Sequence, residues 1–328
     1  MDTMRAAGDL IYFPDDRPGI SRRRAGRGWS YRAPDGTRID DAGERARIAA
    51  LAVPPAYRDV WICPRADGHL QATGRDARAR KQYRYHPDWA AWRAKRKFAD
   101  LARFGAALPR IRRRIRADLT GDPGDRDLAI AAVLAMIDRL AMRVGGRGYA
   151  QDNGTYGATT LRSRHLRLAG DELRLSYPGK GGLRVRRRLR DRGLARALHR
   201  LDDLEGATLV GWTDDDGRRH DVTAGAVNER LSEIAGHDVT AKTFRTWTGS
   251  AAALEAALAA DAPTVTLMAE AASERLANTP AVARSAYIHP KVLGLVDWSG
   301  NRRQRLVDGA PEIRDLRRAE RALLSLIG

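Results

Sequence analysis

The chain of 328 residues contains a single cysteine, Cys63. One cysteine excludes an internal disulfide and a zinc site built from several thiolates, so we interpret Cys63 as a small buried hydrophobic residue. The sequence contains no run of about 18 apolar residues, the length that a membrane-spanning helix needs. Residues 1–16 also lack the charged-then-apolar order of a signal peptide. From these absences we predict a cytoplasmic protein.

Sequence motifs for nucleotide and metal chemistry are missing as well. The Gly179–Lys180 pair is followed by Gly181, and Arg174 stands where a phosphate-binding loop needs its first glycine. We therefore expect no use of ATP. There is no HExxH motif, no paired-histidine cluster and no acidic set with the spacing of a two-metal nuclease. We expect no metal and no other cofactor, so phosphate chemistry would depend on cationic side chains.

Positive charge is the most abundant feature of the chain. Lys and Arg number 59 against 41 Asp and Glu, which gives a net charge of +18 and a pI near 10.8. This excess favours a polyanionic partner, with nucleic acid ahead of an anionic membrane. The composition, 43% hydrophobic and 30% charged, is typical of a globular protein. Arginines number 53 and lysines only six, which makes each lysine position more informative.

The length of the chain predicts two domains. Residues 1–86 are rich in Gly, Pro, Trp and Tyr, with short β-type runs at 28–33 and 59–65 and one helix near 43–53. They predict a small, β-rich N-terminal domain. Residues 87–328 predict a mainly helical domain.

Patterns within the second region refine that prediction. Helical periodicity covers residues 89–119 and 126–144, whereas residues 165–189 alternate with period two around two glycine turns. The alternation predicts a small three-stranded antiparallel sheet inside the helical domain. Later helices should be interrupted at 213–217 and at 279–287. The TDDDG sequence at 213–217 predicts a hairpin turn, because it lacks the ligand spacing of a calcium loop.

Five candidate catalytic residues are spread over the second region. They are Arg143 in MRVGGRGYAQDNG, Lys180 in SYPGKGG, Arg245 in TAKTFRTW, and Asn278 and Tyr287 in NTPAVARSAY. Their order and contexts resemble the active-site set of the type IB DNA topoisomerases in their small bacterial and poxviral form. In that family Arg, Lys, Arg, His or Asn, and Tyr follow in this order. The nine-residue step from Asn278 to Tyr287 is also similar.

The resemblance extends into the first region. GRDARARKQYRYH at residues 74–86 is similar to the family signature GRD(S/A)xxRxQYxY. It implies that Gln82, Tyr83 and Tyr85 face DNA, and we add Arg80 and Lys242 as candidate DNA contacts. The alternative is that Tyr83 and Tyr85, which alternate on a strand, are packing or rim aromatics on one sheet face.

The resemblance implies a role for each of the five residues. Tyr287 attacks a phosphodiester and stays attached to the 3′ phosphate. Arg143 and Arg245 clamp the charged transition state with permanently charged donors. Lys180 protonates the departing 5′ oxygen, which a guanidinium cannot readily do. Asn278, in place of the histidine of poxviral and eukaryotic enzymes, donates a hydrogen bond to a nonbridging oxygen.

The implied fold is α+β: a β-rich N-terminal domain and a helical catalytic domain that together form a C-shaped clamp around double-stranded DNA. The implied activity is ATP- and metal-independent relaxation of supercoils by a monomer associated with the nucleoid.

Two other functions remain open at this level. A tyrosine recombinase shares the tyrosine and the arginine clamp, but it typically carries His-x-x-Arg where this chain has Lys242 and Arg245. A non-catalytic DNA-binding protein would account for the charge without any need for Tyr287. The arginine run at 184–196 predicts a nonspecific phosphate-facing surface, and His165 is more consistent with a structural role.

Overall fold

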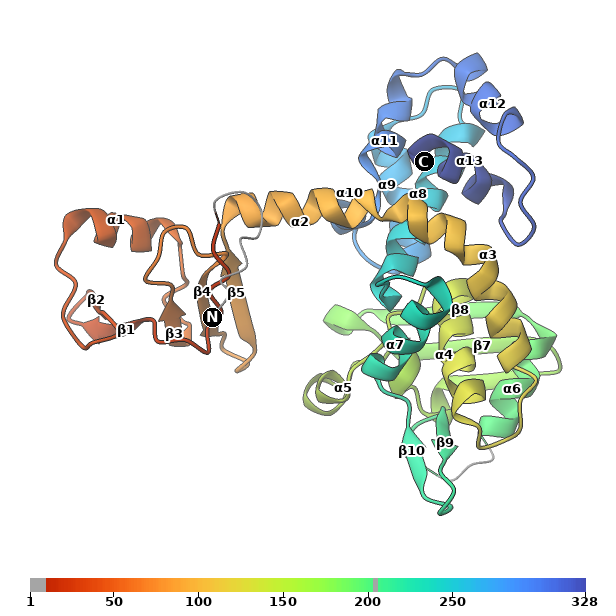
Figure 1. Cartoon of the computed structure of the whole chain (residues 1–328), viewed down its shortest axis with the longest axis horizontal. Coiled ribbons are helices and arrows are strands. Elements are labelled where there is room, and N and C mark those ends of the chain that lie inside the picture. The colour runs from red at the N-terminus through yellow and green to blue at the C-terminus, as the bar shows by residue number, and fades with distance from the viewer. Residues whose placement is uncertain (1–9, 203–205) are drawn as a thin grey trace. The chain divides into compact units, whose positions relative to one another are not determined.

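The computed structural model describes residues 10–202 and 206–328, which divide into two compact units between Ala99 and Asp100. Figure 1 shows the elements of each unit along the chain. The domain boundary predicted at residue 86 falls where helix α2 begins, and α2 belongs to the first unit. The division into a DNA-clamp domain and a catalytic domain stays a prediction.

The first unit is built on one antiparallel sheet of strand order β2-β1-β3-β4-β5, which confirms the predicted β-rich region. Its elements are β1 (Ile20–Ala25), β2 (Gly28–Arg32), α1 (Ala42–Ala50), β3 (Arg58–Ile62), β4 (Leu70–Arg75), β5 (Lys81–Tyr85) and α2 (Pro87–Ala99). Ile20, Ile62 and Ala72 from three strands form a buried cluster with Ile48 of α1. Alternation along each strand brings these apolar side chains to one face. Cys63 is fully buried, as predicted.

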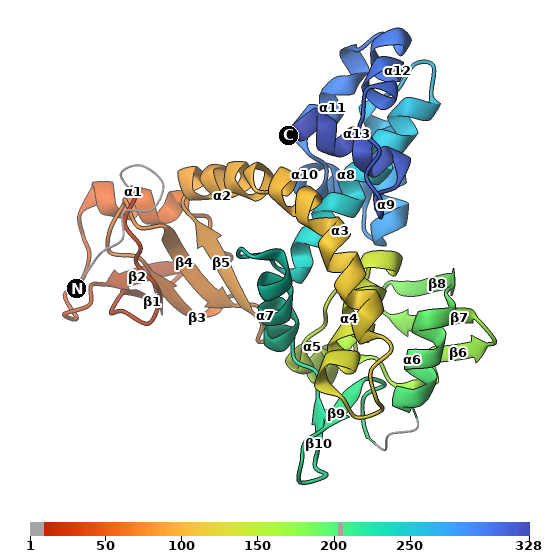
Figure 2. The same ribbon diagram turned by 45° about the vertical axis from the view of Figure 1, so that its right-hand side comes forward.

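The second unit is mainly helical with a small sheet, as predicted (Figure 2). Its elements before the midpoint are α3 (Leu101–Asp118), α4 (Arg126–Leu140), α5 (Arg147–Asn153), the 3₁₀ turns η1 (Ala158–Thr160), η2 (Ser163–His165) and η3 (Lys180–Gly182), strands β6 (Leu166–Ala169), β7 (Glu172–Pro178) and β8 (Arg184–Arg190), and α6 (Arg192–Asp202). They are followed by β9 (Gly211–Thr213), β10 (Arg219–Asp221), α7 (Ala224–Ala235), α8 (Ala241–Ala259), α9 (Val265–Leu276), α10 (Pro280–Tyr287), α11 (Pro290–Leu293), η4 (Gly294–Asp297), α12 (Gly300–Asp308) and α13 (Arg318–Ile327).

Helix α4 lies at the centre of the second unit. It is apolar and buried around most of its circumference, and it packs against α3, α6, α7 and α8. The predicted helix over 126–144 is wrong at its end, because Ala141 adopts a left-handed conformation with φ 53° that stops α4 at Leu140. The predicted helical pattern over 89–119 is likewise divided into α2 and α3 at Asp100.

The predicted three-stranded antiparallel sheet is confirmed as β6-β7-β8. Helices α4 and α6 pack on it (Figure 2). The predicted hairpin turn at 213–217 is also confirmed, since the Asp214 N–H donates to the Arg218 carbonyl at 3.0 Å between β9 and β10. The predicted break over 279–287 is wrong. Thr279 accepts a hydrogen bond from the Val282 N–H and Pro280 occupies the first turn, a combination that starts helix α10.

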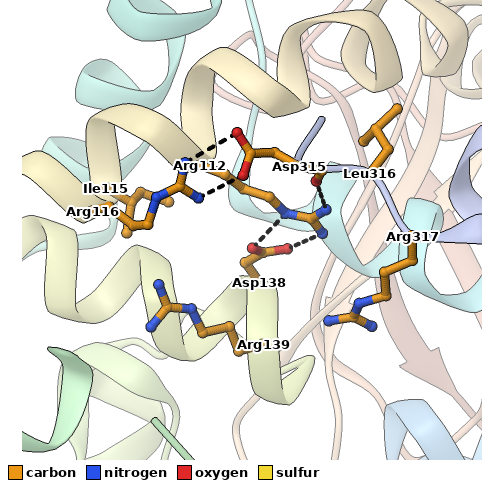
Figure 3. Close-up of a pocket in the computed structure, with 8 residues that line it drawn as sticks. All are labelled: Arg112, Ile115, Arg116, Asp138, Arg139, Asp315, Leu316 and Arg317. Atoms are coloured by element: carbon orange, nitrogen blue, oxygen red, sulfur yellow. Dashed lines mark hydrogen bonds and ion pairs between the residues drawn. The ribbon is translucent and has the colours of Figure 1, made fainter. Parts of the chain in front are cut away.

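A buried ion-pair network fixes helix α13 to the core of the second unit. Arg112 of α3 donates to both carboxylate oxygens of Asp138 on α4, each at 2.9 Å, and to those of Glu320 on α13, each at 2.8 Å. Figure 3 shows Arg112 facing Asp138, with Arg116 paired to Asp315 beside it. Burial opposes the charge on Arg112, but its two carboxylate partners outweigh burial and raise its pKa. The network therefore holds three helices at one point.

Removal of one carboxylate from this network should destabilise the protein, because a buried charge is then left without its partner. We expect Glu320→Ala to lower the free energy of unfolding by about 3–5 kcal/mol, because Arg112 and the Trp247 Nε1–H lose an acceptor inside the core. Chemical denaturation monitored by circular dichroism measures the change. Glu312→Ala is the matched control, because that carboxylate is 88% exposed and also pairs with an arginine, Arg321. Equal stability of the two variants would contradict this role.

No helix among residues 10–202 and 206–328 is long and apolar enough to cross a membrane.

Candidate active site

Two helix C-termini meet at the candidate site. Helix α4 ends before Ala141 and helix α9 ends before Ala277, and both alanines adopt the left-handed conformation, with φ 53° and 48°. The last carbonyl groups of a helix lack intrahelical partners and carry the negative end of its dipole. Two such ends side by side attract cations.

Arg245 bridges these two helix ends. It lies on α8, is only 3% exposed, and donates to the Ala141 carbonyl and, at 2.9 Å, to the Leu276 carbonyl. Its Nε is buried without a hydrogen-bond partner in the described part of the chain. Burial, followed by the nearby positive charge of Arg143, lowers the pKa of Arg245 to about 10. The guanidinium is held rigidly and keeps one donor unused.

Three further arginines bind carbonyls at the same two helix ends. Arg143 donates to the Ala277 carbonyl at 3.5 Å, a long contact. Arg275 donates to the Arg139 carbonyl at 2.8 Å. Arg187 donates to the Leu140 carbonyl at 3.3 Å and to the Arg275 carbonyl at 2.9 Å. The partial negative charge of the helix ends offsets the mutual repulsion of these cations.

Tyr287 lies beside Arg245. It is the last residue of α10, and the Cζ of Arg245 is 5.1 Å from the centroid of its ring. Helix α8 approaches closely at Gly249, where a Cβ would lie 3.0 Å from the backbone oxygen and the Cβ of Tyr287. The Ser250 hydroxyl donates to the Tyr287 carbonyl at 3.1 Å. These contacts hold the backbone that carries the phenol.

The surrounding cations favour ionisation of the phenol. Burial by itself would raise the pKa of Tyr287, but the charge of Arg245 and its hydrogen bond to the phenol, with weaker contributions from Arg143 and Lys242, outweigh burial and lower the pKa. A tyrosine with such neighbours is a better nucleophile at neutral pH than an isolated one. Lys242 itself is exposed, one turn before Arg245 on α8.

Asn278 follows the left-handed residue Ala277 at the end of α9. Both polar atoms of its side chain, Nδ2 and Oδ1, are buried and have no hydrogen-bond partner within the described residues. Buried amides are rarely left unsatisfied unless a ligand or water completes them. The site thus offers an unused donor next to Arg143, which contacts the Ala277 carbonyl.

Lys180 lies at the tip of the β7–β8 hairpin. It is exposed, and no hydrogen bond or ion pair joins its ammonium to Arg143, Arg245 or Tyr287 in the part of the chain that the structure describes. The turn requires glycine, because Gly181 and Gly182 both have φ 78°. Tyr177, which precedes this turn at the end of β7, is buried; burial raises its pKa, and Arg187, Arg143 and Arg245 interact with it electrostatically.

The candidate DNA contacts of the first unit lie on and beside the edge strand β5. Tyr83 and Tyr85 are 48% and 41% exposed, and their rings stack with centroids 6.0 Å apart. Strand alternation places both on one face and Gln82 on the other. Gln82 donates to Asp76 at 3.0 Å, and Arg80 pairs with the same carboxylate at 2.7 Å.

Two family models match the sequence in succession. Residues 28–76 match "Bacterial DNA topoisomerase IB, N-terminal domain", and residues 87–286 match "Eukaryotic DNA topoisomerase I, catalytic core". The second match spans more than half of the chain and includes Arg143, Lys180, Arg245 and Asn278. The chain belongs to the type IB DNA topoisomerase family. Tyr287 follows directly after the matched region.

Curated relatives support the same family. The chain is 30% identical to "DNA topoisomerase 1B" of Acanthamoeba polyphaga mimivirus over 233 residues, which cover 70% of this chain and 69% of the relative. It is 25% identical to "DNA topoisomerase 1B" of vaccinia virus (strain Copenhagen) over 124 residues, or 38% of this chain and 39% of the relative. The resemblance inferred from motif order is confirmed, and the recombinase and non-catalytic alternatives lose their support. The protein is an enzyme of the DNA topoisomerase class.

The structure adds residues that no sequence motif identified. Arg187 and Arg275 share the helix ends with the two predicted arginines, and Tyr177, on the hairpin that carries Lys180, interacts electrostatically with Arg187, Arg143 and Arg245. Within the run 184–196, no feature of the sequence marks Arg187 as different from its neighbours. His165, in contrast, is buried as expected for a structural residue; burial, then Arg164 and Arg162, lower its pKa to about 4.

Proposed function

We propose that this topoisomerase relaxes supercoiled duplex DNA without ATP or metal, by cutting one strand with Tyr287 and resealing it. The observation that carries the proposal is the contact of Tyr287 with Arg245, beside Arg143 and the unsatisfied amide of Asn278. This group combines a nucleophile of lowered pKa with fixed donors for phosphate oxygens. Cleavage of a phosphodiester by a tyrosine at neutral pH needs both features.

The cleavage step is an in-line displacement at phosphorus. The phenol of Tyr287 gives up its proton to solvent, and its oxygen forms a bond to the phosphorus while the bond from phosphorus to the 5′ oxygen breaks. The product is a 3′-phosphotyrosyl linkage and a free 5′ hydroxyl. Because the new phosphodiester has a bond energy similar to the old one, attack by the 5′ hydroxyl reverses the step without an external energy source.

Arg245 and Arg143 stabilise the charge that develops on the nonbridging oxygens. The carbonyls of Ala141 and Leu276 fix the plane of the Arg245 guanidinium before DNA arrives, so little reorganisation is needed in the transition state. The buried Asn278 amide supplies a further donor. An amide cannot change its protonation state, so Asn278 acts by hydrogen bonding alone.

Lys180 is the proposed general acid for the 5′ oxygen. Its exposed position on a glycine turn suits a group that enters the groove of bound DNA and reaches the leaving group only in the complex. Catalytic hydrogen bonds commonly form only when substrate is present.

Phosphate contacts away from the cut come from basic and aromatic surfaces. Gln82, Tyr83 and Tyr85, with Arg80, form the proposed contact of the first unit, and Lys242 joins the second. Exposed arginines on and beside the small sheet line a hollow; they are Arg164, Arg167, Arg174, Arg186 and Arg188. Such surfaces bind backbone phosphates without reading bases. We propose that the two units close around the duplex as a clamp, in a monomer that acts on the nucleoid.

The role of Lys180 leads to a specific rescue. We expect Lys180→Ala to slow single-turnover cleavage of an ordinary strand by about 10²–10⁴-fold. A strand with sulfur at the 5′ bridging position should restore the rate, because a thiolate, with a thiol pKa near 8.5, departs without a proton. Quench-flow with end-labelled duplexes measures both rates. Equal losses on the two substrates would contradict the acid role.

The proposed activity is tested by incubating supercoiled plasmid with the protein in EDTA and without ATP. We expect both negatively and positively supercoiled plasmid to be relaxed in steps. Relaxation that requires Mg²⁺ or ATP, or binding without relaxation, would contradict the proposal.

A further inference from the structure

Arg187 differs from the other arginines of strand β8. Arg184, Arg186, Arg188 and Arg190 are exposed, whereas Arg187 is partly buried. Strand alternation places it on the face of Val185 and Leu189, the side on which β8 packs against α4. Its head group therefore turns from the solvent-facing arginines towards the core of the unit.

The hydrogen-bond partners of Arg187 are three helix-end carbonyls and, at 3.4 Å, the carbonyl of its strand neighbour Arg186; none is a carboxylate among the described residues. Its Nε donates to Leu140 at the end of α4, and its Nη2 donates to Glu274 at 3.4 Å and Arg275 at 2.9 Å at the end of α9. Arg245 uses the next carbonyl of each helix, Ala141 and Leu276. The two arginines thus bind neighbouring carbonyls and each connects the same two helix ends.

We propose that Arg187 is a positioning residue for the catalytic arginines: it holds the ends of α4 and α9 together so that Arg245 and Arg143 stay aimed at the scissile phosphate. The inference rests on the proposed function of those two arginines. It assigns to one residue of the basic strand a role distinct from phosphate binding.

The physical reason lies in the two helix dipoles. Each C-terminus carries roughly half a negative charge, so the two ends repel each other unless cations lie between them. Without Arg187, the carbonyls of Leu140 and Arg275 lose a donor inside the protein and the ends separate. Arg143 follows the end of α4, Arg245 binds both helix ends, and Asn278 is two residues beyond Leu276. All three side chains would therefore shift. A misplacement of about 1 Å can cost about 10²-fold in rate.

The test compares Arg187→Gln with Arg186→Gln on the same strand. Both substitutions remove one positive charge, but Arg186 is exposed and has no role at the helix ends. We expect Arg187→Gln to lower the single-turnover cleavage rate at saturating duplex by about 10- to 100-fold. Arg186→Gln should weaken DNA binding and flatten its salt dependence without this loss of rate. A fluorescent duplex gives Kd, and the labelled adduct gives the rate.

A conservative variant keeps the test decisive if Arg187→Gln folds poorly. Arg187→Lys retains the charge but cannot span both carbonyls as a planar guanidinium does. We expect it to fold and to be slower than wild type by a smaller factor. A full cleavage rate for Arg187→Lys, or equal effects of Arg187→Gln and Arg186→Gln on rate and Kd, would overturn the inference while leaving the proposed function intact. Absence of any adduct in the wild type would overturn the proposed function, and this inference with it.

Discussion

Replacement of Tyr287 by phenylalanine should abolish strand cleavage. The variant keeps the ring that packs against Arg245 but lacks the oxygen that forms the bond to phosphorus. We expect the single-turnover cleavage rate to fall by at least about 10⁴-fold, the scale seen when a covalent nucleophile is removed. Quantification of the protein–DNA adduct after denaturation measures the effect.

DNA binding separates loss of chemistry from loss of structure in this variant. Tyr287→Phe should bind a duplex with the affinity of the wild type, because the phosphate-binding cations are unchanged. Tyr31→Phe is the control, since it removes a hydroxyl from a tyrosine that packs on the core of the first unit. Adduct formation by Tyr287→Phe at more than a small fraction of the wild-type rate would exclude Tyr287 as the nucleophile.

Arg245→Lys should produce the second large effect. A lysine ammonium carries the charge but cannot hold two carbonyls in one plane and still present a donor to phosphate. We expect the cleavage rate to fall by about 10²–10³-fold, the loss typical of one transition-state donor. The cleavage rate at saturating DNA measures the effect on catalysis. Thermal unfolding of each variant measures any loss of stability.

The chain offers a matched control for Arg245→Lys. Arg303 is also buried, 5% exposed, and also binds helix-end carbonyls, those of Ala260 and Asp261 at 2.9 and 2.7 Å. It lies on α12 and binds the end of α8, ten residues beyond Gly249, where Tyr287 packs against that helix. Arg303→Lys should lower stability to a similar extent and leave the cleavage rate within about twofold. Similar rate losses in both variants would show that the effect of Arg245→Lys is structural.

Much of the fold could be predicted from local patterns. Alternating apolar residues and glycine turns identified the two sheets, and helical periodicity identified the long α3 and α4. Helix ends were less accurate, because Ala141 and Ala277 adopt a conformation that alanine rarely takes and that tertiary contacts impose. The short helix α10 was missed because its length is too small for periodicity to be visible.

The candidate site could likewise be predicted from the sequence only in part. The order of Arg143, Lys180, Arg245, Asn278 and Tyr287 could be matched to a family because each lies in a distinctive local sequence. Arg187 could not be found this way, since a run of arginines gives no signal for the one that turns inward. The pairing of two helix ends was equally hidden, because it joins segments more than a hundred residues apart in the chain.

The most direct test of the proposed mechanism is to map the covalent link. A duplex labelled on either side of the break is trapped with denaturant, digested with protease and analysed by mass spectrometry. The mechanism predicts one peptide, containing Tyr287, attached to the 3′ phosphate, with a free 5′ hydroxyl on the other fragment. Attachment to a 5′ phosphate, or to a residue other than Tyr287, would contradict it.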